Sequence, residues 1–276
     1  MGLIAAACWG SADFLAAVYS RKLGLFTTLL VSSVGALAIY LTLFIVLRPD
    51  VDVDGPILLA LFGQSVLIVL TYLSFYRALA LGPLAVVTPI ASAFAIVVVM
   101  LSFIFIRERL SLIQSVGAVV TVGGVMMASL RHGQQRVGRG VLFAVGALLG
   151  FGCAAFFSGL FARKLGFLLP AVITRSMITA MYLAAASTTK LRIAKRLSLK
   201  TLGMLAVLGM VDGLGFLAFS RGAQIGTISI VTLASGAYPL VPLTLGVVVF
   251  KERLARNQWI GVAAVFAGVA LLSWTR

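Results

Sequence analysis

The chain has 276 residues, of which 62% are hydrophobic and 11% are charged, and its formal net charge is +15. Soluble domains carry about 25% charged residues, and a soluble chain of this composition would expose apolar patches far larger than soluble monomers tolerate. The lysines and arginines stand between apolar runs and not along one face interleaved with aromatics, which argues against nucleic-acid binding. The composition therefore excludes a soluble protein and predicts an integral membrane protein in a lipid bilayer.

Ten apolar runs follow one another along the chain, separated by short loops. A helix needs about 20 apolar residues to cross a bilayer, and the runs lack the alternating pattern of a membrane β-barrel. The sequence therefore predicts an all-α integral membrane protein with ten transmembrane helices and no room for a soluble domain. The predicted helices cover residues 3–20, 25–47, 56–79, 84–106, 112–130, 140–162, 167–189, 201–224, 228–250 and 258–275.

The first and eighth predicted helices each carry an acidic residue in mid-run, Asp13 and Asp212. A charged side chain at the bilayer centre costs about 2.5–3.5 kcal/mol on insertion scales, so it is expected to face a cavity, a partner or a substrate. Each carboxylate is a candidate proton carrier or a candidate site for the amine of a substrate. The alternative is a hydrogen bond between packed helices, or an ion pair with an arginine such as Arg175.

Two arginines and three prolines elsewhere in the predicted helices are further candidates for functional residues. Arg77 and Arg221 could contact a substrate carboxylate or a gate, because arginine binds carboxylates in a bidentate manner, or they could anchor helix ends at the interface. Pro89 in the fourth helix, and Pro239 and Pro242 in the ninth, remove backbone hydrogen bonds. Such breaks either free carbonyls near the midplane, where transporters hold substrate, or bend a packing helix.

Eight aromatic residues on the first, third, fourth, eighth and ninth helices form another group. Two of them are four residues apart on the third helix and so share one face. The group either lines a cavity for an amphipathic substrate or packs between helices and at the interface. Its members are Trp9, Tyr72, Phe75, Tyr76, Phe94, Phe216, Phe219 and Tyr238.

The two halves of the chain repeat each other. Residues 72–129 align without a gap with residues 216–273 at an offset of 144, and the starts of the halves align at an offset of 142. Each half holds five helices, and because five is odd the halves insert with opposite orientations. The sequence therefore predicts two inverted repeats, 1–135 and 136–276, that form one transport domain around a central cavity.

Glycines recur in the fifth and tenth helices at the same spacing. Gly117 and Gly124 align with Gly261 and Gly268. Small residues let helices approach closely in membranes. We therefore expect the fifth and tenth helices to pack on each other.

These features resemble the drug/metabolite transporter superfamily, specifically its ten-helix EamA-type members. The resemblance rests on Trp-Gly-Ser-Ala-Asp-Phe at 9–14, Tyr-Arg-Ala-Leu at 76–79, Pro-Ile at 89–90, and Glu-Arg-Leu at 108–110 and 252–254. It implies a basket of helices 1–4 and 6–9 around a central cavity, with helices 5 and 10 packed outside. It also implies a multi-pass protein of the bacterial plasma (inner) membrane, for which a monomer is sufficient.

The resemblance implies a secondary transporter that exports amino acids or related small metabolites by alternating access. Asp13 and Asp212 leave open whether protons are coupled to transport. Alternative functions are an exporter of cationic drugs and a non-transporting membrane scaffold or sensor. The sequence contains no nucleophile–base set, phosphate-binding loop or metal-ligand spacing, so it predicts neither an enzyme, nor a metal site, nor a cofactor.

The orientation in the membrane is predicted in two opposite ways. The loops after odd-numbered helices carry more lysine and arginine than the other face, which places them in the cytoplasm. The resemblance places both termini in the cytoplasm instead.

Overall fold

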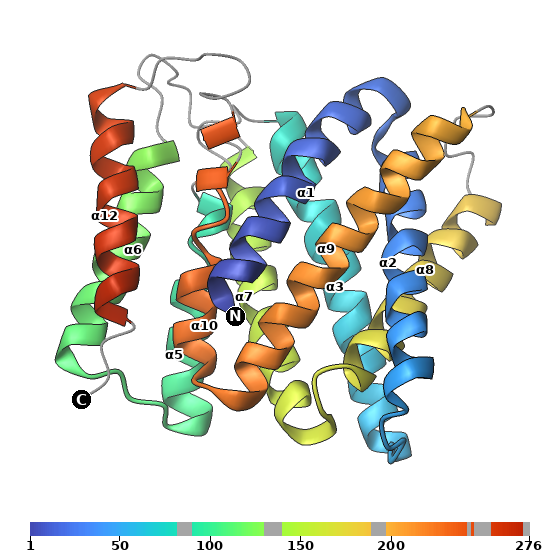
Figure 1. The fold of residues 1–276 in the computed structure, drawn as a ribbon, viewed down its shortest axis with the longest axis horizontal. Coiled ribbons are helices and arrows are strands. Elements are labelled where there is room, and N and C mark those ends of the chain that lie inside the picture. The colour runs from blue at the N-terminus through green and yellow to red at the C-terminus, as the bar shows by residue number, and fades with distance from the viewer. Residues whose placement is uncertain (82–89, 130–139, 189–196, 242–243, 246–254, 273–276) are drawn as a thin grey trace.

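The structure is a computed structural model that describes residues 1–81, 90–129, 140–188, 197–241, 244–245 and 255–272 (Figure 1). These residues contain ten α-helices, one for each predicted span, so the predicted all-α architecture is confirmed. In chain order the helices are α1 (Gly2–Leu23), α2 (Leu25–Leu47), α3 (Gly55–Leu81), α5 (Phe94–Ile106), α6 (Leu112–Ser129), α7 (Gly140–Leu165), α8 (Leu169–Thr188), α9 (Leu199–Ile225), α10 (Ile228–Ser235) and α12 (Arg256–Leu272).

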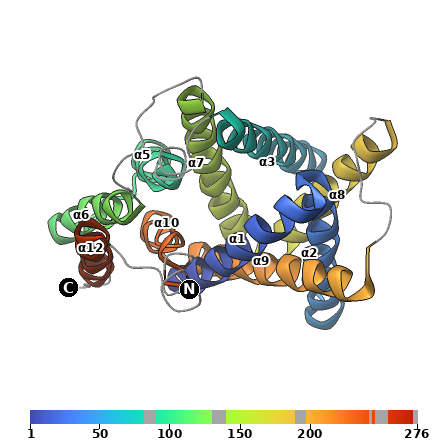
Figure 2. The ribbon, with the colours of Figure 1, turned by 90° about the horizontal axis from the view of Figure 1, so that it is seen from above.

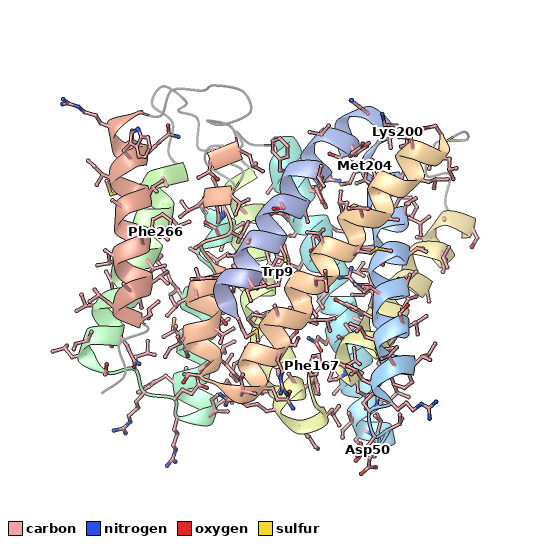
Figure 3. The ribbon with its side chains drawn as sticks, viewed as in Figure 1. Trp9, Asp50, Phe167, Lys200, Met204 and Phe266 are labelled. Atoms are coloured by element: carbon pink, nitrogen blue, oxygen red, sulfur yellow. The ribbon has the colours of Figure 1, made fainter. Side chains whose placement is uncertain are left out.

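The outer surface of the bundle is apolar. Ile45, Leu59 and Phe266 are 69%, 71% and 67% exposed, and Figure 3 shows Phe266 on α12 between the two edges, whereas Asp50 and Lys200 lie at opposite edges. Six helices, α1, α2, α3, α7, α8 and α9, are long and apolar enough to cross a membrane. Helices suit this solvent because their backbone hydrogen bonds are all internal.

The predicted ninth helix is interrupted in the structure. α10 ends at Ser235, and residues 236–239 form a turn before helical geometry resumes. The amide of Tyr238 donates to the carbonyl of Ser235 at 3.1 Å, which is the tighter spacing of a 3₁₀ turn. Pro239, at the end of this turn, has no N–H for a helical hydrogen bond.

The predicted fourth helix is interrupted at the equivalent position. A turn at Ala93, the repeat mate of Ala237, separates helical residues 90–92 from α5. The other two prolines that the sequence analysis identified as helix-breaking, Pro89 and Pro242, lie outside the described residues. Both halves therefore carry a broken helix at the same register.

The two halves pack as inverted repeats. In Figure 1, α1 ends at the upper edge, where α2 begins, whereas its mate α7 ends at the lower edge, where α8 begins. The packing between the halves follows the same inversion. In the first half α1 packs on α9 and α10 of the second, and in the second half α7 packs on α3 and α5 of the first. Glycines allow these approaches, because a Cβ on Gly10 would clash with Val241 and one on its mate Gly152 would clash with Val97. Val97 and Val241 are themselves repeat mates.

The helices α6 and α12 pack on each other beside the rest of the bundle, as Figure 2 shows from above. The recurring glycines lie at this contact. A Cβ on Gly117 would lie 2.9 Å from the carbonyl oxygen of Gly268, and one on Gly124 would lie 2.8 Å from that of Gly261. The recurring glycine spacing predicted that these two helices pack on each other. The other described helices are therefore available to surround the centre of the bundle.

Candidate functional site

A cavity of about 220 Å³ lies between the two halves. Its lining comes from α1, α2, α3, α5, α7, α8 and α9 together with Tyr238, while α6 and α12, as far as they are described, contribute none of it. Ser20 near the end of α1, Thr28 near the start of α2 and Tyr76 near the end of α3 line the cavity, whereas their repeat mates near the opposite edge, on α7, α8 and α9, do not. The cavity is therefore displaced toward the upper edge of Figure 1.

The sequence analysis named two acidic, two basic and eight aromatic candidates; ten of these twelve residues line this cavity, and two do not. Arg77 and Arg221 are exposed outside it. The guanidinium carbon of Arg77 lies 5.9 Å from the ring centroid of Phe143, and that of Arg221 lies 5.4 Å from the ring centroid of Phe167. The ten on the lining are Trp9, Asp13, Tyr72, Phe75, Tyr76, Phe94, Asp212, Phe216, Phe219 and Tyr238.

Most of the lining follows the pseudo-two-fold axis, but its charge does not. The mate of Asp13 is Ala155 and the mate of Asp212 is Ile68, and both apolar mates also line the cavity. The charges of the site are therefore asymmetric within a symmetric frame. Among the mates that line it together are Trp9 with Phe151, Ser32 with Thr174, Tyr40 with Tyr182, Tyr72 with Phe216, Phe75 with Phe219, and Phe94 with Tyr238.

An ion pair between α8 and α9 lies on the lining. Nη2 of Arg175 donates to Oδ2 of Asp212 at 2.9 Å, and the two side chains remain 20% and 27% exposed. The guanidinium carbon of Arg175 lies 5.8 Å from the ring centroid of Tyr40, whose hydroxyl donates to the carbonyl of Gly213 at 3.1 Å. Asp212 is positioned by close packing of α9 on α2, because a Cβ on Gly209 would clash with the α2 backbone.

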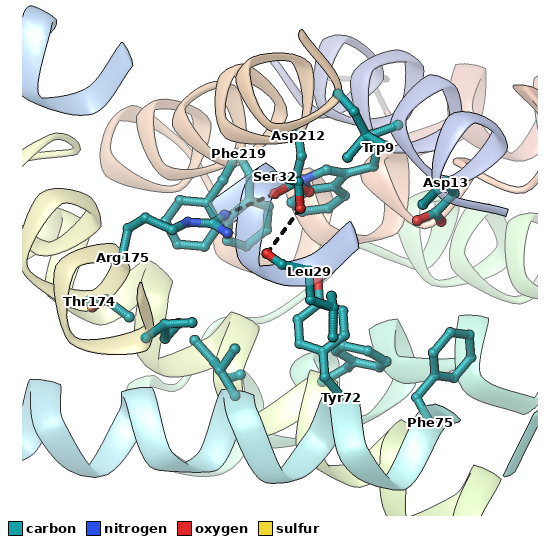
Figure 4. A pocket seen from close by; sticks show the side chains of 18 of the residues that line it. Trp9, Asp13, Leu29, Ser32, Tyr72, Phe75, Thr174, Arg175, Asp212 and Phe219 are labelled. Atoms are coloured by element: carbon teal, nitrogen blue, oxygen red, sulfur yellow. Dashed lines mark hydrogen bonds and ion pairs between the residues drawn. The ribbon is translucent and has the colours of Figure 1, made fainter. Parts of the chain in front are cut away.

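Asp13 faces the same cavity from α1. Its side chain is exposed, and in the view of Figure 4 Trp9 lies between it and Asp212. Asp13 takes part in neither of the two ion pairs recorded within the described ranges. The cavity thus presents two carboxylates, one of which is paired with the guanidinium of Arg175.

The rest of the lining is largely aromatic. All eight aromatic residues that the sequence analysis grouped together lie on it. Their recorded ring contacts fall into two groups. In one, Trp9 lies 5.7 Å from Phe219, and in the other, Tyr72 lies 5.4 Å from Phe151 in an edge-to-face arrangement. Aromatic lining with a few polar groups is the usual composition of a small-molecule site.

A second polar cluster joins the halves at the lower edge of Figure 1. We call Glu108, Arg163 and the first residues of α10 the clasp. Glu108 accepts from Nη2 of Arg163 at 2.6 Å, from the amides of Ile228 and Ser229 at 3.1 Å each, and from the Ser229 hydroxyl at 2.8 Å. A carboxylate at a helix N-terminus is favoured by the helix dipole. The repeat mate of Glu108, Glu252, lies outside the described residues.

Sequence reasoning missed some members of the site. Tyr40 and Tyr182 were not singled out, although they are mates at an offset of 142, and the repeat could have found them. Arg175 was named as a partner for an acid but not as part of a cavity. Its mate is Ser33, which hydrogen-bonds Thr179 at 2.7 Å instead, so the repeat carries no signal for it.

The chain matches the EamA-like transporter family twice, over residues 1–130 and 138–274. An uncharacterized protein of Methanocaldococcus jannaschii is 33% identical over 134 residues, which is 48% of this chain and 96% of that relative. The relative is therefore about as long as one half. A solved crystal structure superposes with a TM-score of 0.82 at 19% identity and covers 99% of this chain and 96% of its own, so the whole fold recurs there.

The two family matches together cover nearly all of the chain, and each falls on one five-helix half of the observed fold. The helices that surround the cavity are those that the resemblance implied, and the lateral pair is also the implied one. The chain belongs to the EamA-like transporter family and is a multi-pass membrane transporter.

Proposed function

We propose that this protein is a secondary carrier that exports amino acids or related small metabolites across the plasma (inner) membrane of a bacterium by alternating access. The observation that carries the proposal is the central cavity, in which Asp13 and the Arg175–Asp212 pair lie among aromatic side chains. Charged groups suit the ammonium and carboxylate of such metabolites, and aromatic rings suit their apolar parts. The bilayer and a small-molecule substrate are the partners, and a monomer is sufficient because one chain contains both halves.

Alternating access is supported by the unequal ends of the bundle. The cavity extends toward the upper edge, whereas the clasp joins the first half to α7 and α10 at the lower edge. Inverted repeats can exchange conformations, so that one half adopts the arrangement of the other. Opening the clasp while the upper ends close would expose the same cavity to the opposite side.

One observation favours a second candidate, an exporter of cationic compounds. Asp13 faces the cavity beside Trp9 and outside the recorded ion pairs, and aromatic faces attract organic cations. A scaffold or sensor without transport would have its centre filled by side chains, and a cavity of about 220 Å³ weighs against it.

Efflux and counterflow from proteoliposomes test the proposal. The wild type is expected to accelerate the movement of at least one amino acid, and Asp212→Asn is expected to reduce it. Arg77→Gln is the matched control, because Arg77 lies outside the lining and should leave flux unchanged. Equal flux with and without protein across an amino-acid panel would refute the proposal, and flux of organic cations alone would establish the second candidate.

A further inference from the structure

The Arg175–Asp212 pair has unused binding capacity that faces the cavity. A guanidinium carries five N–H donors in a fixed fork, and the hydrogen bond to Asp212 uses one of them. Arginine and carboxylate commonly pair through two parallel hydrogen bonds, whereas only the Nη2–Oδ2 bond is recorded here. Both side chains also keep about a quarter of their surface open. The pair can therefore admit a further charged group.

We propose that this pair is the receptor for the headgroup of an α-amino acid, with the substrate carboxylate bound by Arg175 and the substrate ammonium bound by Asp212. This inference rests on the proposed function and names its substrate class. The two protein charges are 2.9 Å apart. In an α-amino acid the ammonium and the carboxylate are both bonded to the α-carbon, so a single headgroup can reach both side chains.

Charge balance selects a zwitterion over a ligand with a single charge. A zwitterion replaces one ion pair by two and leaves no charge uncompensated. A ligand with only an amine would bind Asp212 and leave Arg175 without its counter-ion. A ligand with only a carboxylate would bind Arg175 and leave Asp212 without its counter-ion. Leaving one partner of such a pair without compensation in a partly dehydrated site is costly.

Tyr40 holds Arg175 in position for this exchange. Its ring is 1% exposed, it lies beneath the guanidinium at 5.8 Å, and its hydroxyl is fixed to the Gly213 carbonyl. The guanidinium therefore stays on the lining when its contact with Asp212 changes.

The residues beside the pair indicate an apolar side chain on the substrate. Asp212, Phe216 and Phe219 follow one face of α9, because they are spaced four and then three residues apart. All three line the cavity, and Trp9 packs on Phe219 at 5.7 Å. Figure 4 shows Trp9 and Phe219 close to Asp212. A headgroup on the ion pair would thus direct its side chain among aromatic rings.

Three matched ligands test the inference by calorimetric titration of the purified protein in nanodiscs. They are L-phenylalanine, phenethylamine, which lacks the carboxylate, and 3-phenylpropionate, which lacks the amine. The wild type is expected to bind L-phenylalanine about 10- to 100-fold more tightly than either analogue, the range that hydrogen bonds to charged groups contribute. Flux of L-phenylalanine is measured on the same preparation in proteoliposomes.

Two variants should change the ranking in opposite directions. Arg175→Gln is expected to remove the preference for the carboxylate, so that L-phenylalanine binds no better than phenethylamine. Asp212→Asn is expected to remove the preference for the amine and to tighten binding of 3-phenylpropionate, because Arg175 loses its resident anion. Arg221→Gln is the control, since Arg221 lies outside the lining and should keep the wild-type ranking. A purely structural role would weaken all three ligands alike.

The outcomes separate this inference from the proposed function. Wild-type flux of amino acids with equal binding of the three ligands, or with a ranking that neither variant changes, would overturn the headgroup receptor and leave the carrier. If one variant does not fold, an unchanged ranking in the other is sufficient to overturn it. The expected ranking without flux of any solute would support the receptor and overturn the carrier. No binding of L-phenylalanine by the wild type would overturn the receptor directly.

Discussion

Replacing Gly124 by alanine tests the close packing of α6 on α12. A Cβ at this position would lie 2.8 Å from the carbonyl oxygen of Gly261 and from the amide nitrogen of Val265. Ordinary van der Waals contact begins at 3.4 Å, so the helices must separate by about 0.6 Å or distort. Overpacking of this kind costs about 1–3 kcal/mol. We expect the free energy of unfolding to fall by that amount.

Gly123 is the matched control on the same helix, because a Cβ there meets nothing within 4 Å. Alanine is more stable than glycine inside a helix by about 0.5–1 kcal/mol, so Gly123→Ala should stabilise the protein slightly. The two variants should then differ by about 1.5–4 kcal/mol. Unfolding in mixed micelles titrated with sodium dodecyl sulfate measures both. Equal denaturation midpoints for Gly123→Ala and Gly124→Ala would show that the helices do not approach this closely.

Three other substitutions test separate parts of the structure. Glu108→Ala removes the acceptor of the clasp and should lower the free energy of unfolding by about 1.5–3 kcal/mol, whereas the exposed neighbour Arg109→Ala should change it by less than about 0.5 kcal/mol in the same titration. Tyr40→Phe deletes the hydrogen bond to Gly213 and should cost about 1 kcal/mol while flux persists, and complete loss of flux would contradict the supporting role of this hydroxyl. Asp13→Asn should abolish any acceleration of efflux by an imposed pH gradient and keep counterflow, and an unaltered response to the gradient would remove Asp13 as the proton carrier.

The sequence was sufficient for the ten helices and for most of the aromatic lining. Hydrophobic length alone predicts each span, and the repeat register pairs each helix of one half with a helix of the other. Which helices enclose the centre was implied by the family resemblance. Asp13 and Asp212 could be identified because acids are costly in an apolar run. These features depend on local composition and on an alignment of the chain with itself, both of which the sequence contains.

Contacts between distant segments could not be predicted. Arg175 lies 37 residues before Asp212, and no repeat mate signals that α8 turns it toward α9. Glu108 begins one of the two Glu-Arg-Leu motifs, but nothing in the motif indicates that its amide donors lie 120 and 121 residues away on α10. The interruption of the ninth helix could be located only within a few residues, because the prolines indicate a break but not which carbonyls lose their partners.

The asymmetric charge on the symmetric lining has an evolutionary consequence. In a dimer of identical five-helix chains, a mutation to aspartate would appear twice, once in each subunit, and the centre would gain two acids or none. Joining the copies in one polypeptide lets the two equivalent positions change independently. One half can then carry Asp13 where the other has Ala155, and one can carry Asp212 where the other has Ile68. A single polypeptide can thus acquire a one-sided recognition surface, which a homodimer of half-length proteins is barred from by its own symmetry.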